Sequence, residues 1–271
     1  MQKQRLQHTT ASQIFGRATT RLAASFIDQT LETQVPYAPY AFGVLVAADQ
    51  ARKLGRDSVA CLELGVAGGN GLAALEGHAL AVSQILDLEI KVFGFDTGSG
   101  LPEPRDERDM PYKFRAGQYS MDHTSLTSRL QNATLVLGDV GVTMKSLDNL
   151  LGGSQVGFVA CDLDYFSSTR DALNAFCDGE NEALLLPRPH FYFDNVIGNL
   201  DASYSHSVGE LAAIDDFNVR NRRVRIDPVR VFDGYPTPTR WFQQIYVMHR
   251  FDHPQYRTFI GSASETSLRL E

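Results

Sequence analysis

Cysteine is scarce in this sequence. The 271 residues include three cysteines, Cys61, Cys161 and Cys177, and no two of them have the CxxC spacing. An odd number of cysteines without metal-ligand spacing argues against a disulfide framework and against a structural zinc site. Cys61 and Cys161 stand in apolar, strand-like runs, so we expect them to be buried and unreactive.

Long apolar runs are also missing. No stretch approaches the roughly 20 apolar residues that a membrane-spanning helix needs, and the first residues hold no apolar core of a signal peptide. Acidic residues outnumber basic ones, 32 to 25, for a formal net charge of −7. Such a surface disfavours non-specific binding to nucleic acid or to anionic membranes. We therefore expect a cytoplasmic protein that binds neither nucleic acid nor membrane.

The composition is that of an ordinary globular protein, with 43% hydrophobic and 21% charged residues. The length suits one large α/β domain with appended helices. Apolar spacing predicts helices over residues 10–33 and 39–54, separated by Pro36. We accordingly divide the chain into an N-terminal helical extension, residues 1–55, and a main domain, residues 56–271.

The main domain contains five short apolar runs, most of which end beside an acidic residue. They are residues 58–64, 90–96, 134–137, 156–162 and 191–194. Segments with helical spacing lie between these runs, so strands and helices alternate. This alternation predicts βαβ units, whose strands form a mainly parallel sheet.

The helices and the last strands complete the expected fold. Helical spacing predicts helices over residues 72–86 and 208–217, and Ser168 begins a capping-box pattern that predicts a third helix. Residues 224–232 and 242–249 alternate like strands and predict an antiparallel pair at the sheet edge. The expected architecture is a Rossmann-like α/β fold with a mostly parallel seven-stranded sheet.

Two further segments stand out by their polarity. Residues 103–128 are charged and contain prolines, so we expect a lid or a partly ordered loop there. Residues 220–230 include five arginines, which predict a solvated face. The sharper alternative for these arginines is contact with an anion, such as a uronic acid or a phosphate.

A glycine-rich turn, E-L-G-V-A-G-G-N-G over residues 63–71, joins the first strand to the next helix. Glycines allow a tight turn and close approach to a ligand, and the helix N-terminus adds N–H groups. The spacing is not that of a dinucleotide fingerprint, and Glu63 would repel a pyrophosphate but accept hydrogen bonds from an amino-bearing or cationic ligand. The turn therefore favours S-adenosylmethionine, bound by Glu63, Gly65, Gly68 and Gly69; the alternative is a turn that binds no ligand.

Three acids at later strand ends extend the predicted cofactor site. Asp96 ends the second strand, where an acid typically accepts hydrogen bonds from ribose hydroxyls. Asp139 follows the third strand and could reach the adenine edge or cap the next helix. Asp162 ends the fourth strand and is the third acid that we expect beside the cofactor.

Four segments together resemble one known family. They are residues 63–69, E-L-G-V-A-G-G; residues 95–102, F-D-T-G-S-G-L-P; residues 162–173, D-L-D-Y-F-S-S-T-R-D-A-L; and Asp194-Asn195. This set is similar to the motifs of the macrocin O-methyltransferase-like family, which are class I methyltransferases that modify sugars of antibiotics and related molecules. The chain departs from that family at Gly98, where an aromatic residue is usual, and at Asn195, where a second aspartate is usual. The resemblance covers residues 58–217.

Carboxylates from two strand ends are expected to meet at the ligand-binding edge of the sheet. Crowded carboxylates repel one another unless they are protonated or bind a cation, and oxygen ligands suit Mg²⁺. The resemblance implies such a metal, with Asp162, Asp194 and Asn195 as ligands and Asp164 as the general base. Asn195 brings an oxygen without a charge, which lowers the expected metal affinity. The alternative is that these acids cap turns and helices.

The resemblance implies a methyltransferase domain over residues 56–271 that uses S-adenosylmethionine, with Mg²⁺ as a candidate second cofactor. Its acceptor would be the hydroxyl of a sugar, a glycoside or another small molecule. The alternatives are an N- or phenol-O-methyltransferase, an NAD(P)-dependent oxidoreductase and a non-catalytic module that binds S-adenosylmethionine. We also expect a homo-oligomer, since closed homo-oligomers are common among soluble proteins.

Overall fold

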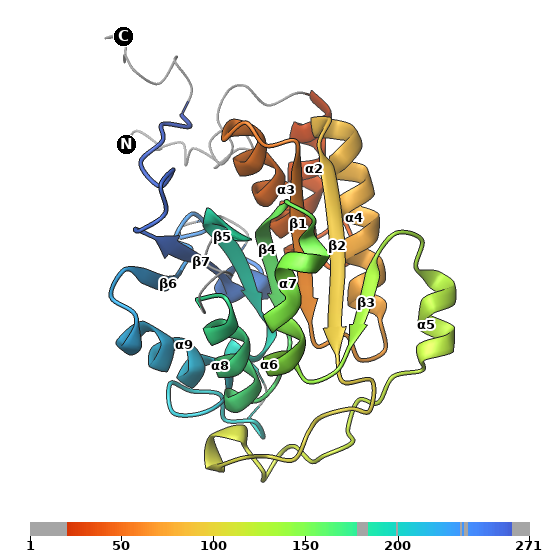
Figure 1. Ribbon diagram of the computed structural model, residues 1–271, viewed down its shortest axis with the longest axis vertical. Helices are drawn as coiled ribbons and strands as arrows, with labels where there is room; N and C mark the ends of the chain where they lie inside the picture. The colour runs from red at the N-terminus through yellow and green to blue at the C-terminus, as the bar shows by residue number, and fades with distance from the viewer. Residues whose placement is uncertain (1–20, 178–183, 199, 234, 236–237, 262–271) are drawn as a thin grey trace, which may run out of the picture.

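The computed structural model describes residues 21–177, 184–198, 200–233, 235 and 238–261. Its centre is a seven-stranded sheet of order β3-β2-β1-β4-β5-β7-β6 (Figure 1). The strands are β1 Ser58–Leu64, β2 Glu89–Asp96, β3 Thr134–Leu137, β4 Gln155–Cys161, β5 Leu185–Phe193, β6 Val224–Pro228 and β7 Ile245–Arg250. Strands β1 to β5 are parallel, and β7 is antiparallel to both β5 and β6. This confirms the Rossmann-like sheet and its antiparallel C-terminal pair.

Helices cover both faces of the sheet (Figure 1). The α-helices are α2 Arg21–Leu31, α3 Ala38–Lys53, α4 Asn70–Leu86, α5 His123–Arg129, α6 Val140–Thr143, α7 Leu147–Leu151, α8 Phe166–Ala175 and α9 Gly209–Arg220. One hydrophobic core joins α3 and α4 to one face, and a second joins α6 to α9 to the other. No helix in the described part of the chain is long and apolar enough to cross a membrane.

Helix α3 lies directly against the sheet. A Cβ on Gly43 would come 2.1 Å from the ring of Phe158 in β4, so glycine permits this close approach. Gln50 of α3 reaches β5, where its side chain donates to the Arg188 carbonyl at 2.8 Å and accepts from the Arg188 N–H at 3.1 Å. The helix therefore has a fixed position relative to the strand ends, and it carries Tyr40 to the carboxyl end of β1.

The structure corrects three of the expected boundaries. Helix α8 begins at Phe166, so Ser168 lies inside the helix and does not cap it. Strand β5 begins at Leu185, before the expected start at residue 191, and strand β6 ends at Pro228. The predicted helix over residues 10–33 is described only from residue 21, where α2 confirms it; residues 10–20 lie outside the described part.

Candidate active site

A cavity of about 460 Å³ opens at the carboxyl ends of the five parallel strands. Seven of the predicted site residues line it: Gly65, Asp96, Asp139, Asp162, Asp164, Asp194 and Asn195. Glu63, Gly68 and Gly69 are not among the residues on its wall. This edge is where open α/β sheets bind their ligands; the structure brings these seven residues to one cavity, and their roles stay predictions.

The three glycines predicted to bind the cofactor differ in what they permit. Gly65 has φ +85°, and a Cβ there would lie 2.0 Å from the Asp162 carbonyl oxygen. Gly69 has φ +79°, and its Cβ would lie 2.1 Å from the side chain of Leu126 in α5. A Cβ on Gly68 would meet nothing within 4 Å. The fold itself thus requires Gly65 and Gly69, whereas Gly68 borders open space.

Asp96 holds the glycine turn in place. Its Oδ2 accepts hydrogen bonds from the backbone N–H groups of Val66 at 2.8 Å and Ala67 at 2.9 Å, and its Oδ1 accepts from Gly98 at 2.6 Å. Oδ2 thus accepts two bonds, whereas Oδ1 accepts one and can accept another, so this arrangement is compatible with a ribose hydroxyl at Oδ1. The ribose contact stays a prediction.

Asp139 caps a helix, as the sequence analysis allowed. Its Oδ1 accepts a hydrogen bond from the Gly141 N–H at 2.9 Å, at the N-terminus of α6. Its other oxygen lies 3.5 Å from a guanidinium nitrogen of Arg105, which also pairs with Asp171. Asp139 therefore closes one side of the cavity, and its contact with adenine stays a prediction.

Glu63 is buried behind the cavity wall, with 2% of its surface exposed. Its Oε1 accepts a hydrogen bond from the Tyr40 hydroxyl at 2.8 Å, and a Cβ on Gly71 would come 2.0 Å from this oxygen. Its Oε2 is buried without a hydrogen-bond partner in the described structure. Burial raises the pKa of Glu63 to about 8. The contact of this oxygen with an amino-bearing ligand stays a prediction.

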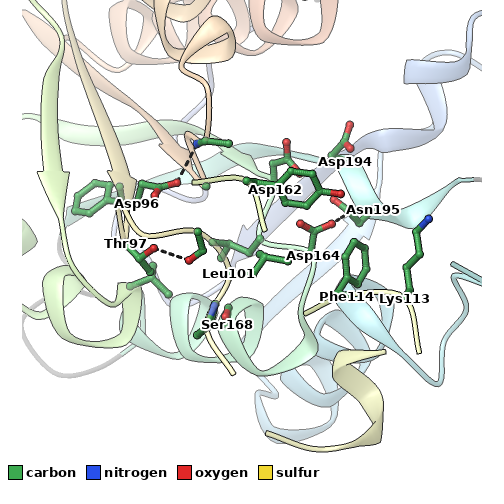
Figure 2. Close-up of a pocket in the computed structure, with 18 of the residues that line it drawn as sticks. Asp96, Thr97, Leu101, Lys113, Phe114, Asp162, Asp164, Ser168, Asp194 and Asn195 are labelled. Carbon is green, nitrogen blue, oxygen red and sulfur yellow. Dashed lines mark hydrogen bonds between the residues drawn. The ribbon is translucent and has the colours of Figure 1, made fainter. Parts of the chain in front are cut away.

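The turns after β4 and β5 bring Asp164 and Asn195 together (Figure 2). Asp164 has φ +58° and is 7% exposed, and its Oδ1 accepts a hydrogen bond from the Asn195 amide at 2.7 Å. The same amide nitrogen lies 2.8 Å from the Tyr204 hydroxyl. Burial, and then the nearby charge of Asp194, raise the pKa of Asp164 to about 7. Positive φ at a non-glycine residue is uncommon and is often found at functional sites.

Two more acids stand beside this pair. Burial, and then the charges of Asp194 and Asp164, hold the pKa of Asp162 well above its usual range. Asp194 accepts a hydrogen bond from the Tyr192 hydroxyl, and its backbone carbonyl accepts one from Gln244 at 2.8 Å. In the described residues no three His, Cys, Asp or Glu side chains are arranged to hold a metal ion. The ligand set of Asp162, Asp194 and Asn195 stays a prediction; the Asn195 Oδ1 in it is buried without a hydrogen-bond partner in the described structure.

The segment over residues 103–128 contains the 3₁₀-helix η1 Glu107–Asp109 and most of α5, and it is anchored to the domain. Asp109 is fully buried and accepts hydrogen bonds from the backbone N–H and the hydroxyl of Ser167, both at 2.8 Å. Met110 and Phe114 form a small apolar cluster with Tyr165. Sequence reasoning missed that this loop places Lys113, Phe114 and Tyr119 on the cavity wall. The signal for it was a pair of apolar residues, Met110 and Phe114, in a polar segment.

No family model matches this chain, and no curated protein matches it. Solved structures do: the crystal structure of CalS11, a calicheamicin methyltransferase, is similar over 86% of this chain and 94% of that chain, with a TM-score of 0.53 and 16% identity. The O-methyltransferase TomG of Streptomyces achromogenes, involved in tomaymycin synthesis and solved with S-adenosylmethionine, is similar over 92% of this chain and 99% of that one, with a TM-score of 0.45 and 14% identity. The likeness to CalS11 shows that this chain shares the Rossmann-like fold of that methyltransferase.

Proposed function

We propose that this protein transfers a methyl group from S-adenosylmethionine to a hydroxyl of a small acceptor, such as a sugar or a glycoside. One observation carries the proposal: a single cavity connects the glycine turn and Asp96 to the buried carboxylate of Asp164. The methyltransferase fold supports the cofactor class, and the similarity to CalS11, a calicheamicin methyltransferase, supports an acceptor of this kind.

The residues at the turn fit S-adenosylmethionine. Gly68 borders open space, so the backbone there can approach a ligand closely. Asp96 retains acceptor capacity for ribose hydroxyls. The Oε2 of Glu63 is buried without a hydrogen-bond partner, and in this proposal it accepts from the amino group of the cofactor. When bound, this cofactor supplies an electrophilic methyl group on its sulfonium.

The chain's own residues would position the acceptor and take its proton. Asp164 lines the cavity, and its hydrogen bond from Asn195 fixes the direction of the carboxylate. In the proposed reaction, Asp164 accepts the hydroxyl proton as the acceptor oxygen attacks. The segment over residues 103–128 contributes Phe114 and Tyr119 to the wall of the same cavity. Positioning of the two reactants would account for most of the rate enhancement.

No step of this reaction is assigned to a metal. Asn195 donates to Asp164 through its amide nitrogen, whereas its Oδ1 is buried without a hydrogen-bond partner in the described structure, and Asp194 accepts from Tyr192. Asp162, Asp194 and Asn195 stay the predicted ligands for Mg²⁺, to be tested directly by titration.

The test begins with calorimetric titration of the metal-free protein with S-adenosylhomocysteine, without and then with Mg²⁺. We expect micromolar binding, and tighter binding with Mg²⁺ would support the predicted metal ligands. Transfer of a labelled methyl group would then be measured on sugars, phenols and amines in parallel. Preference for phenols or amines would favour the alternative acceptors, and binding without any transfer would favour a non-catalytic module. A folded protein that fails to bind S-adenosylhomocysteine contradicts the proposal.

A further inference from the structure

The cavity has two ends of different character (Figure 2). Asp96 and Thr97 lie at one end, beside the glycine turn, and Asp164, Asn195 and Lys113 lie at the other. We call this second end the acceptor end. Under the proposed function, on which the present inference rests, the methyl acceptor enters there.

Two cations reach the acceptor end from separate segments. Lys113 comes from the loop over residues 103–128, and Arg240 from the start of the 3₁₀-helix η5 Arg240–Gln244; both line the cavity. Arg240 is placed by a hydrogen bond from its Nη2 to the Ile197 carbonyl at 2.7 Å, two residues after Asn195. Both segments bond to the part of the chain that follows β5. Arg240 contacts Ile197 there, and the Tyr112 hydroxyl donates to the Ala202 carbonyl at 2.9 Å.

Neither cation forms an ion pair with a carboxylate in the described part of the chain. Their neighbours differ: Arg105 pairs with Asp171, Arg108 with Asp106, and Arg170 with Asp171. Two acids on the same cavity wall have other partners, since Asp164 accepts from Asn195 and Asp194 accepts from Tyr192; Lys113 acts on Asp164 electrostatically without forming an ion pair. The positive charges of Lys113 and Arg240 are therefore uncompensated by direct contact, in a protein whose formal net charge is −7.

The backbones that carry these two cations are fixed. The Lys113 N–H donates to the Met110 carbonyl at 2.8 Å, and Met110 is fully buried. Arg240 is followed by Trp241 and Phe242, each 6% exposed in the main core. The backbones of Lys113 and Arg240 are thus fixed beside the cavity by buried neighbours. This favours binding of an anion without reorganisation of the loops.

We propose that the methyl acceptor carries an anionic group, a phosphate or a carboxylate, which binds Lys113 and Arg240 while its hydroxyl lies at Asp164. Guanidinium and ammonium groups bind both kinds of anion through charge-assisted hydrogen bonds. The anion contact that the sequence suggested for the arginines at residues 220–230 is instead assigned to this pair. Arg220 and Arg230 of that run are exposed and already paired with Asp216 and Asp233.

The experiment compares three probes of the same ring size on the full chain saturated with S-adenosylhomocysteine. They are α-D-glucose 1-phosphate, D-glucuronate and methyl α-D-glucoside, titrated by calorimetry. We expect at least one anionic probe to bind about tenfold or more tightly than the neutral glucoside, as charge-assisted hydrogen bonds predict. The phosphate and carboxylate arms identify which anion the pair prefers. Equal affinity for all three probes, or no binding of any, overturns the inference.

Three variants locate the effect. We expect Lys113→Gln and Arg240→Gln each to weaken binding of the preferred anion about tenfold, with unchanged affinity for S-adenosylhomocysteine. Arg222→Gln is the matched control, because Arg222 is exposed and lies outside the cavity wall. If the first two variants instead lose affinity for S-adenosylhomocysteine, the cations serve the cofactor and the inference is wrong. If the unaltered protein does not bind S-adenosylhomocysteine, the proposed function itself fails, and this inference falls with it.

Discussion

Glu210, in the first turn of α9, accepts a hydrogen bond from the backbone N–H of Asn195 at 2.8 Å. Its other carboxylate oxygen accepts from the backbone N–H of Leu163 at 3.3 Å. The side chain is fully buried, and burial holds its pKa well above the usual range. One carboxyl group thus ties the turn after β4, which carries Asp164, to the turn after β5.

Replacement of Glu210 by glutamine should loosen this connection. The amide keeps the shape of the side chain but has one acceptor oxygen, so one of the two backbone N–H groups loses its partner. We expect a loss of about 1–3 kcal/mol in the free energy of unfolding, measured by urea denaturation. Methyl transfer should fall by more than the affinity for S-adenosylhomocysteine, because the displaced residue is Asp164. Glu89→Gln, at an exposed position on β2, is the control. Equal stability of the two variants would contradict the role of Glu210.

Gly65 and Gly68 offer a matched pair within one motif. Gly65→Ala places a Cβ 2.0 Å from a backbone oxygen at φ +85°, and we expect it to destabilise the fold by about 3 kcal/mol or more. Gly68→Ala meets nothing within 4 Å, so its stability should change by less than about 1 kcal/mol. If the open space beside Gly68 receives the cofactor, this second variant should still bind S-adenosylhomocysteine more weakly. Unchanged affinity in a folded Gly68→Ala protein would argue against the predicted contact.

His190 should make stability depend on pH. Burial, and then the nearby charges of His249 and Arg188, lower its pKa to about 4, so the folded protein keeps this imidazole neutral. The unfolded chain binds a proton below about pH 6.5, whereas the folded chain does so only near its lowered pKa. Stability from this residue is therefore complete above pH 6.5 and falls by up to about 3 kcal/mol as the pH drops toward 4.

The measurement is the free energy of unfolding at several pH values between 7 and 4. His190→Gln should show a shallower decline than the unaltered protein over this range. His206→Gln is the control, since the His206 side chain is 74% exposed and should not change the slope. Parallel curves for the unaltered protein and His190→Gln would refute the prediction.

The sequence predicted the sheet well because each parallel strand is short, apolar and followed by a glycine or an acid. It missed the start of β5, whose early part contains Pro187 and Pro189. Those prolines lie where the pairing register shifts between Val156 and Phe158 of β4, and Gln50 from α3 supplies hydrogen bonds to Arg188 between them. A partner 138 residues away satisfies this irregular backbone, and no local pattern reveals it.

Prediction of the site was limited in the same way, by contacts between residues far apart in the sequence. Acids at strand ends were predictable, since the ends of parallel strands meet at one edge of the sheet. The start of α8 was not, because Asp109 contacts Ser167 at the beginning of the helix from 58 residues away. Lys113 was missed for a related reason: its place on the cavity wall depends on Met110 and Phe114 packing with Tyr165, a tertiary contact inside a polar segment.

Asp164→Asn gives the most direct test of the proposed chemistry. Asparagine has nearly the same shape, and it tolerates the positive φ of +58° at this position better than most residues. The variant should therefore fold and bind S-adenosylhomocysteine with affinity within about threefold of the original. Its amide cannot take the proton of the acceptor hydroxyl, so we expect the methyl transfer rate to fall by about 10²- to 10⁴-fold. Asp148→Asn, at an exposed position in α7, is the control and should keep the full rate. A full rate in Asp164→Asn would mean that another group removes the proton, and the role assigned to Asp164 would be wrong.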